Sequence, residues 1–341
     1  MSGSVPVVSQ PFVDCVAEAL AMRNASRGTR RDESYLRWRY LDRPGPAPAF
    51  VVWLREGAEN LAAATVAPHE IQVDGQRLAI GIVGDISVAP AARGRGLAAQ
   101  LLEAVALESQ SLDGVLVMPN PPLHATLRKS GWHEMAGLVR FVRYVGAPPG
   151  ATPRAFTQLL ARGASSLLGA APALRRRSRL VGFRLEERGE LPADYPEFWS
   201  RASAAAPLIG TRAPAYLRWR YFAHPLHRYR FFELREGAQL AGYAFARSEG
   251  EELWIDDWLA LDVKNLDILG AKLLERERAR GCVSIHTRTQ AHGVASIPWR
   301  NLGFLSRSDT QAVFVTGRWA ARAESHARNS AGYFTPGDKD V

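Results

Sequence analysis

Cysteine and lysine are both scarce in this sequence of 341 residues, which contains two cysteines and four lysines. Cys15 and Cys282 lie far apart in the chain, so they predict neither a disulfide framework nor a cysteine-based metal site. The eight histidines are scattered without the spacing of metal ligands, and we therefore expect no metal centre. This use of cysteine favours a protein of the cytoplasm.

The sequence also has no hydrophobic run that approaches the roughly 20 residues of a membrane-spanning helix. Residues Met1 to Pro11 contain no basic region followed by an apolar core, so we expect no secretory signal. Apolar residues make up 47% and charged residues 23% of the chain, as in soluble globular proteins. A chain of this length suffices for two domains.

The net charge is +9, and arginine carries almost all of the positive charge. An arginine-rich surface attracts anions, among them coenzyme A (CoA), an acidic carrier protein, nucleic acid or anionic lipid. The same bias also fits an arginine-rich genome and solvated surfaces. Because no nucleic-acid-binding motif accompanies the charge, we do not expect nucleic acid to be a partner.

A glycine-rich turn between a strand and a helix is the most informative segment of the sequence. An apolar strand is predicted over 82–88, and the turn 93–98 reads Arg-Gly-Arg-Gly-Leu-Ala before an amphipathic helix over 97–109. Free backbone N–H groups at the start of a helix, together with the helix dipole, favour an anion such as phosphate. Gly94 and Gly96 allow the backbone to approach such a ligand without a Cβ in the way.

This turn resembles the acyl-CoA loop of the GNAT acyltransferases, in which Arg or Gln is followed by two residues, Gly, one residue, and Gly or Ala. Arg93, Gly96 and Ala98 fill the three fixed positions. A dinucleotide-binding loop would need a longer glycine spacing and an acidic residue after the next strand. That strand, 114–120, ends in Asn120 instead. The resemblance implies acetyl-CoA, or another acyl-CoA, as a co-substrate.

The sequence also contains an internal repeat. Residues 34–44, with the core Tyr-Leu-Arg-Trp-Arg-Tyr, return at 215–225, and each copy is followed by a strand that ends in Leu-Arg-Glu-Gly-Ala. We therefore predict an α/β (α+β) protein of two tandem GNAT-like domains. Each is expected to be a mixed, mainly antiparallel twisted sheet flanked by helices.

The predicted domain boundaries follow changes in composition. We expect a GNAT domain over 1–146, a linker rich in Ala, Pro and Arg over 147–179, a second GNAT-like domain over 180–319, and a disordered polar tail over 320–341. Within the linker, Phe156 to Leu168 is a candidate amphipathic helix. Such a basic segment either contacts a membrane surface or packs against the domains.

The second copy lacks the glycine-rich turn. Asp262-Val-Lys-Asn-Leu-Asp267 stands at the corresponding position. Two carboxylates there would repel a pyrophosphate group. The second domain therefore resembles a degenerate GNAT domain, and the acyl-CoA site is expected in the first domain.

For the first domain, the resemblance implies that the pyrophosphate binds to the backbone of the turn and that the pantetheine arm pairs with the preceding strand. Asn120 is at the position of an asparagine that helps to hold this arm, although it can also act as the N-cap of the next helix. The implied cofactor-binding residues are Ile86, Ser87, Val88, Arg93, Gly94, Arg95, Gly96, Leu97, Ala98 and Asn120.

The implied chemistry is direct acyl transfer from a thioester to an amine, which requires a proton acceptor and a donor to the oxyanion. The Val88 N–H would be that donor by resemblance. Many family members carry a tyrosine as general acid where this sequence has Leu127. His124, one helical turn earlier, is a substitute candidate, or else a surface histidine. Asp85 is the candidate base, or else an acid that pairs structurally.

We therefore expect an acetyl-CoA-dependent N-acyltransferase that acts on a small-molecule amine. The Trp-Arg-Tyr segments resemble those of GNAT proteins associated with cell-surface polysaccharide synthesis, which makes an amino sugar one candidate acceptor. An acyl carrier protein as the acyl donor, and a non-catalytic CoA-binding sensor or scaffold, are the alternatives.

Overall fold

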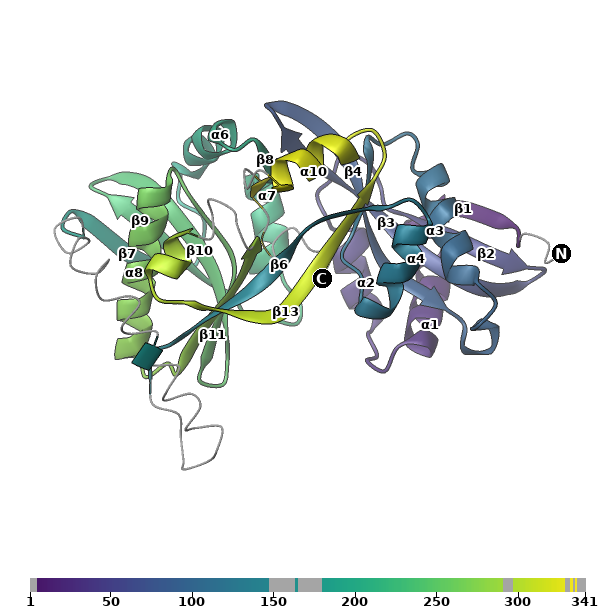
Figure 1. The fold of residues 1–341 in the computed structure, drawn as a ribbon, viewed down its shortest axis with the longest axis horizontal. Coiled ribbons are helices and arrows are strands. Elements are labelled where there is room, and N and C mark those ends of the chain that lie inside the picture. Colours follow the sequence, from purple (N-terminus) through teal and green to yellow (C-terminus); the bar gives the residue numbers. More distant parts are fainter. Residues whose placement is uncertain are drawn as a thin grey trace. The chain divides into compact units, whose positions relative to one another are not determined.

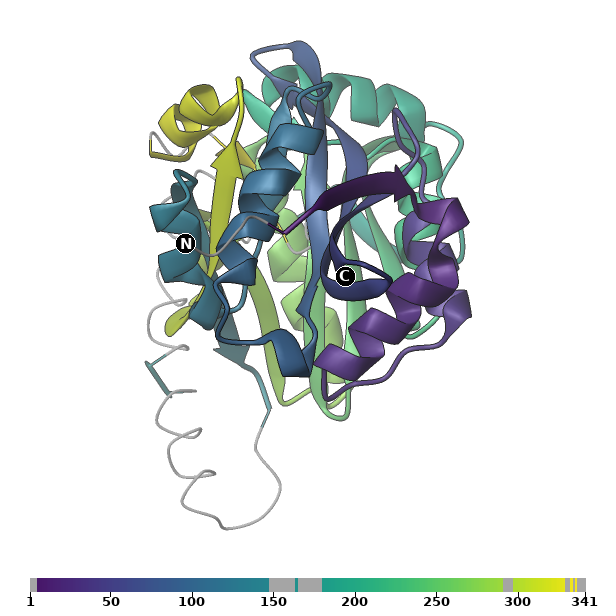
Figure 2. The same cartoon turned by 90° about the vertical axis from the view of Figure 1, so that its right-hand side faces the viewer.

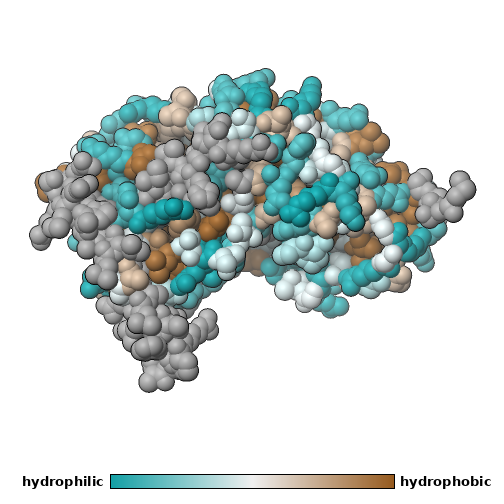
Figure 3. All heavy atoms as spheres, in the orientation of Figure 1, coloured by the Kyte–Doolittle hydropathy of each residue, from teal (hydrophilic) through white to brown (hydrophobic). Residues whose placement is uncertain are grey.

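The computed structural model describes residues 5–146, 163–164, 180–290, 297–328, 332–333 and 335 (Figure 1). These residues divide into two compact units. Unit 1 comprises 5–136 and 311–328, and unit 2 comprises the described residues of 137–310 together with 332–333 and 335. On the face drawn in Figure 3, hydrophilic and hydrophobic side chains are interspersed.

Unit 1 is a mixed sheet with the strand order β1-β2-β3-β4-β5-β13. All neighbouring strands are antiparallel except β4 and β5. The strands are β1 (Val7–Pro11), β2 (Phe50–Glu56), β3 (Glu59–Val73), β4 (Gln76–Val88), β5 (Gly114–Val117) and β13 (Leu305–Thr316). The α-helices are α1 (Val16–Ser26), α2 (Glu33–Tyr40), α3 (Leu97–Glu108), α4 (His124–Lys129) and α10 (Ala320–Arg328), and the short 3-10 helices are η1 (Phe12–Asp14), η2 (Pro90–Ala92) and η3 (Pro121–Leu123).

Local sequence explains several of these elements. Asp74 and Gly75 join β3 to β4 in a two-residue turn with positive φ at both positions, 50° and 76°, which Asp-Gly favours in hairpins. Asp32 caps α2 by accepting a hydrogen bond from the Tyr35 N–H. The predicted apolar face of α3 is buried against β2, β3 and β4, on the other side of these strands from α1 and α2 (Figure 2).

Unit 2 has the strand order β6-β12-β11-β10-β9-β7. Here β11 and β12 are the parallel pair, and the other pairs are antiparallel. The strands are β6 (His133–Tyr144), β7 (Phe183–Arg188), β9 (Arg230–Glu236), β10 (Gln239–Glu249), β11 (Glu252–Ala260) and β12 (Ser284–Gln290), with the short pair β8 (Leu208–Gly210) and β14 (Gly332–Tyr333). The helices are α6 (Tyr195–Ala205), α7 (Pro214–Leu217), the π-helix η5 (Arg218–Phe222), α8 (Val263–Ala279) and α9 (Ile297–Asn301).

The two units share a connectivity. In each unit three antiparallel strands, β2-β3-β4 or β9-β10-β11, are followed by a helix and a strand parallel to the third. The prediction of mixed, mainly antiparallel sheets flanked by helices is confirmed. The repeated Tyr-Leu-Arg-Trp-Arg-Tyr segment forms α2 in unit 1 and spans α7 and η5 in unit 2.

Each unit takes one strand from the other half of the sequence. From Gly137 onward, β6 belongs to unit 2, where it pairs with β12, while the last residues of β13 pair with β5 in unit 1. The contact with β5 is close, because a Cβ on Gly114 would lie 2.2 Å from the Thr316 carbonyl oxygen. Phe314 is fully buried in the core of unit 1. Strand β13, from the C-terminal part of the chain, therefore completes the sheet of unit 1.

This arrangement differs from the predicted boundaries. Unit 2 begins at 137 rather than after the linker, and residues 320–328, predicted as part of a disordered tail, form α10 in unit 1. The candidate helix 156–168 lies outside the described residues, apart from 163–164. The sequence analysis also did not anticipate α6, whose Tyr195 and Phe198 are buried. Periodicity predicts which segments form strands, but not which distant strand each one pairs with.

A buried histidine in unit 2 gives a prediction about acid stability. His286 stacks on Trp254 with 4.4 Å between ring centroids, and its Nε2 lies 2.8 Å from the Ser284 hydroxyl. Burial, together with the charges of Arg140 and Arg307, lowers the pKa of His286 to about 4. The folded protein disfavours the charged ring, so the neutral His286 ring contributes to stability. This contribution is complete above about pH 6.5, the pKa of an unfolded histidine, and is lost as the pH falls toward 4.

We expect the free energy of unfolding to fall by up to ~3 kcal/mol across that interval. His286→Phe keeps the stacking on Trp254 and should remove this part of the pH dependence. Urea unfolding between pH 7 and pH 4 measures the free energy of unfolding of the wild type and of the variant. An equally steep decline in the variant would contradict the assignment to His286.

Candidate functional site

The parallel strands of unit 1 separate where the sequence analysis places the acyl-CoA site. Pairing between β4 and β5 ends at Val83 and Val117, whereas β4 continues to Val88 and pairs there with Ala62 of β3. Residues 84–88 thus have β3 on one side and, within the described residues, no strand on the other. An extended ligand can add to such an edge as a strand would.

A β-bulge lies in the same segment. The register between β3 and β4 shifts between Ala63 and Thr65, and Asp85 has a φ of 47°. A positive φ is uncommon for a residue other than glycine, although aspartate tolerates it better than most. The extra residue lets Ile86 and Val88 pack against the core around α3, while Asp85 contacts residues of α1 and α2.

The glycine-rich turn follows directly. Gly94 and Gly96 have positive φ values of 81° and 76°, and Gly96 is the N-cap of α3. No side chain among the described residues caps this helix and its first turn has no acidic residue, so neither a cap nor a first-turn carboxylate occupies the donors at its N-terminus. The Arg93 guanidinium donates to the Ser26 carbonyl at 3.0 Å and fixes the turn to the end of α1.

The structure brings most of the predicted cofactor-binding residues together. Ile86, Ser87 and Val88 lie on the separated part of β4, and residues 93–98 form the turn and the start of α3. Asn120 follows β5 with an exposed side chain that makes no cap hydrogen bond to η3, so the alternative role as a side-chain cap is not realised.

The carboxylate of Asp85 lies in a cluster of cationic and hydroxyl groups. Its Oδ1 accepts from Arg23 Nε at 3.2 Å, and its Oδ2 accepts from the Tyr40 hydroxyl at 2.8 Å. Arg39 lies 3.3 Å from Oδ2, and Arg27 lies 3.6 Å from Oδ1. Arg23 and Arg39 are about as buried as Asp85, whereas the Arg27 side chain is 35% exposed.

These contacts decide the charge of Asp85. Burial alone would raise its pKa, but the charges of Arg39, Arg27 and Arg23 and the hydrogen bond from Tyr40 lower it below the ordinary value of aspartate. The carboxylate is therefore ionised throughout the neutral range. A general base works best with a pKa near the working pH, so the cluster favours the structural alternative for Asp85.

These arginines were not predicted from the sequence. The available signals were the spacing of Arg23 and Arg27, which stand four residues apart at the end of α1, and the Arg-Tyr pair of the repeated segment, Arg39 and Tyr40.

His124 lies at the start of α4, and its ring packs against Phe314 of β13 with 5.4 Å between centroids. Its Nε2 is buried and finds no hydrogen-bond partner among the described residues. Leu127, at the position where the resemblance would place a tyrosine, is fully buried. No hydroxyl at position 127 can protonate a leaving thiolate.

Unit 2 carries an aspartate at the equivalent place. Asp85 stands three residues before Val88, which pairs with β3, and Asp257 stands three residues before Ala260, which pairs with β10. Asp257 is fully buried. Among the described residues it accepts hydrogen bonds from the Arg212 guanidinium at 3.1 Å, the Thr335 hydroxyl at 2.7 Å and the Tyr243 hydroxyl at 2.9 Å.

The rest of that region differs between the units. Asp262 caps α8 by accepting from the Asn265 N–H at 2.7 Å, so a carboxylate occupies the helix N-terminus. Trp258, at the position of Ile86, is fully buried, donates to the Thr287 hydroxyl and packs edge-to-face on Trp299. These indoles fill the space beside β11.

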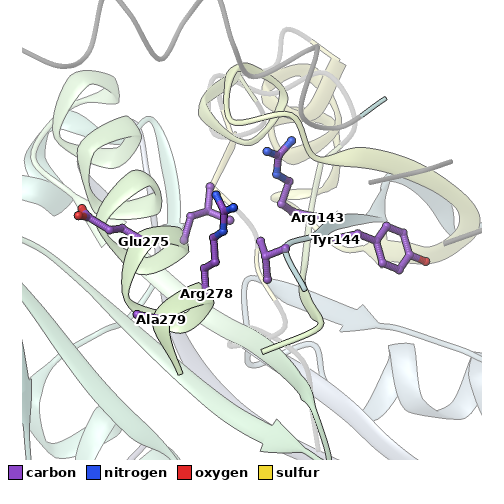
Figure 4. A pocket seen from close by; sticks show the side chains of 7 residues that line it. Arg143, Tyr144, Glu275, Arg278 and Ala279 are labelled. Atoms are coloured by element: carbon purple, nitrogen blue, oxygen red, sulfur yellow. The ribbon is translucent and has the colours of Figure 1, made fainter. Parts of the chain in front are cut away.

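Unit 2 also has a pocket of about 540 Å³ between the end of β6 and α8. Arg143 and Arg278 project into it, while the Glu275 carboxylate points away from them (Figure 4). The residues that line this pocket include none of the predicted site residues. Among the described residues, no group of three His, Cys, Asp or Glu side chains could hold a metal ion. No helix in the described ranges combines the length and hydropathy needed to cross a membrane.

Comparison with known families finds a similarity over the part of the chain that carries this site. Residues 10–135 match the family model described as "Acetyltransferase (GNAT) domain". This part of the chain, with the separated strands and the glycine-rich turn, is therefore similar to GNAT acetyltransferase domains. A comparison with curated proteins finds no match.

Solved structures resemble the chain over nearly its whole length. A GCN5-related N-acetyltransferase from Anabaena variabilis is 12% identical with a TM-score of 0.63, and the match covers 96% of this chain and 75% of that one. A "Probable N-Acyltransferase" from Enterococcus faecalis is 9% identical with a TM-score of 0.65, covering 94% and 74%. A GCN5-related N-acetyltransferase from Kribbella flavida is 14% identical with a TM-score of 0.59, covering 96% and 74%. At these identities the likeness establishes a shared fold.

Proposed function

We propose that unit 1 binds an acyl-CoA, in the first place acetyl-CoA, and transfers its acyl group to the amine of a small molecule. The observation that carries this proposal is the combination of an open edge on β4, which ends at Val88, with an uncapped helix N-terminus at Leu97, nine residues later. The first offers backbone groups to an extended pantetheine arm, and the second offers N–H donors to a pyrophosphate. The match of residues 10–135 to the GNAT family supports it.

The residues divide into three roles in this proposal. The turn at 93–98 binds the pyrophosphate, and Ile86 to Val88 align the arm so that the Val88 N–H meets the oxyanion. Asp85 is a positioning residue that ties α1 and α2 to the bulge. His124 is the candidate proton donor to the leaving thiolate, because it has a buried nitrogen without a hydrogen-bond partner in the described structure.

We also infer that the units are copies of one ancestral domain and that only unit 1 binds CoA. The shared connectivity and the shared sequence segments support duplication. In unit 2, the Asp262 carboxylate occupies the helix N-terminus, and Trp258 fills the space along the strand. A bound stoichiometry of one CoA per chain is the corresponding expectation.

We further propose that the acceptor is an amino sugar and that the protein is located in the cytoplasm. Two alternatives keep the same site: transfer from an acyl carrier protein, for which the net charge of +9 is suitable, and a CoA-binding sensor without turnover, which the leucine at 127 suggests.

An acyl-CoA and amine panel with detection of free thiol tests the proposal. Thiol release that depends on an amine supports the acyltransferase. Tight CoA binding without release favours the sensor, and release only from an acylated carrier protein favours the second donor. No binding of CoA at all would contradict the whole assignment.

A substitution in the turn tests the CoA site directly. Gly96→Asp places a carboxylate at the start of α3, where it repels a pyrophosphate. We expect CoA affinity to fall by about 2 kcal/mol or more, roughly thirtyfold, without loss of folded protein. Gly96→Asn is the matched control, since asparagine tolerates a positive φ as well as aspartate does and has nearly the same size without the charge. Calorimetry that finds equal affinities for the two variants would contradict an anion site here.

A further inference from the structure

The structure leads us to propose that the acceptor amine carries its own anionic group, a carboxylate or a phosphate, and that Arg27 binds this group. The inference rests on the proposed acyl transfer in unit 1 and names the class of acceptor. It depends on three observations about Arg27: its place, its exposure and the way its charge is matched.

Arg27 lies beside the segment where the acyl group would be transferred. One of its guanidinium nitrogens is 3.5 Å from the Ile86 carbonyl oxygen, on the part of β4 that has separated from β5. It is the residue directly after α1, and the neighbouring Ser26 carbonyl is bound by Arg93 of the glycine-rich turn. The end of α1, the bulge and the turn therefore meet at Arg27.

The charge of Arg27 is only partly matched by protein. Asp85 is the carboxylate with which it pairs, at 3.6 Å, and Arg23 already binds the same oxygen at 3.2 Å. The other oxygen of Asp85 accepts a hydrogen bond from the Tyr40 hydroxyl at 2.8 Å and lies 3.3 Å from Arg39. A single carboxylate is thus shared by three guanidinium groups, and Arg27 is the most distant of them.

Exposure separates Arg27 from its neighbours. The side chains of Arg23 and Arg39 are 5% and 6% exposed, and that of Arg27 is 35% exposed. The first two hold the buried carboxylate in place. Arg27 keeps donors available to a ligand, and a guanidinium binds carboxylate or phosphate through two parallel hydrogen bonds.

This charge distribution discriminates among acceptors. A simple alkylamine arrives as an ammonium ion and meets an excess of positive charge beside the bulge, which disfavours its binding. An acceptor with a carboxylate or phosphate near its amine supplies the negative charge that Arg27 lacks. The site is therefore suited to amino acids, amino-sugar phosphates and similar zwitterions.

Paired acceptors of matched shape test the inference. The probes are glucosamine 6-phosphate against glucosamine, and phenylalanine against phenethylamine, each with acetyl-CoA and detection of free thiol. We expect kcat/KM to favour the anionic member of at least one pair by about tenfold or more, the scale of a charge-assisted hydrogen bond. Arg27→Gln should lower that preference by about tenfold, mainly through KM, and Arg27→Lys should restore part of it.

Arg30→Gln is the matched control. Arg30 lies three residues after Arg27, is exposed, and has no ion pair in the described part of the chain. The Arg30→Gln substitution therefore removes the same charge and should leave the preference unchanged. Calorimetry with CoA confirms that each variant is folded. A wild-type preference for the neutral members, or an Arg27→Gln variant that keeps the anionic preference, would overturn the inference alone. Absence of thiol release with every acceptor would overturn the proposed function and this inference with it.

Discussion

A fragment that ends in the linker, residues 1–155, is expected to bind no CoA and to be largely unfolded, although it contains the whole glycine-rich turn. The fragment lacks the strand that pairs with β5, and with it Phe314, which is fully buried in the core of unit 1. Removal of one such side chain costs about 3–5 kcal/mol, and a domain is stable by only about 5–15 kcal/mol. Circular dichroism and CoA calorimetry on the fragment measure the result.

Co-expression with residues 156–341 provides the control. The second fragment carries β13 and α10, so the two pieces together can rebuild both sheets even though the chain is cut. We expect CoA binding to return when they are combined. A fragment 1–155 that unfolds cooperatively and binds CoA by itself would show that β13 is dispensable.

Replacement of Asp85 is expected to lower the free energy of unfolding rather than only to lower the turnover rate. Asp85→Asn leaves Arg23 and Arg39 buried without their carboxylate, and removal of one partner from a buried ion pair costs about 3–5 kcal/mol. The folded state lowers the pKa of Asp85, so its contribution is present above about pH 4 and is lost as the pH falls further. Urea unfolding should therefore show a large difference between variant and wild type at pH 7 and a smaller one at pH 3.

Asp14→Asn is the control for this measurement. Asp14 is exposed and has no ion pair in the described structure, so the change should stay within about 0.5 kcal/mol. If Asp85→Asn kept wild-type stability and CoA affinity but lost turnover at neutral pH, the carboxylate would be the general base after all. A positioning residue would instead lose stability and activity together.

The strand, turn and helix of the candidate cofactor site were predictable because their signal is local. The strand, the turn and the helix are consecutive, and each needs particular residues: apolar side chains before Asp85, glycine at 94 and 96, and an apolar face after Leu97. The repeat likewise predicted two sheets of the same kind. The helix bounds of α3 agree with the prediction to within one residue.

The environment of Asp85 was not predictable in the same way. Arg23 stands 62 residues earlier in the chain, and nothing in the sequence of β4 indicates which arginine reaches the bulge. The same reasoning applies to β13. Its apolar residues predict a strand, but its pairing with β5 depends on the close packing around Gly114.

The exchange of strands also has a consequence for how the protein is made. Gln311 follows Ala136 by 175 residues, so unit 1 lacks its last strand while the ribosome translates most of unit 2. At roughly 5–20 residues per second, this interval lasts about 10–35 s. During that time β5 presents an open edge, the kind of surface that invites aggregation and engages chaperones. Unit 1, the first to begin synthesis, is thus completed only near the end of translation, when residues 311–328 have been added.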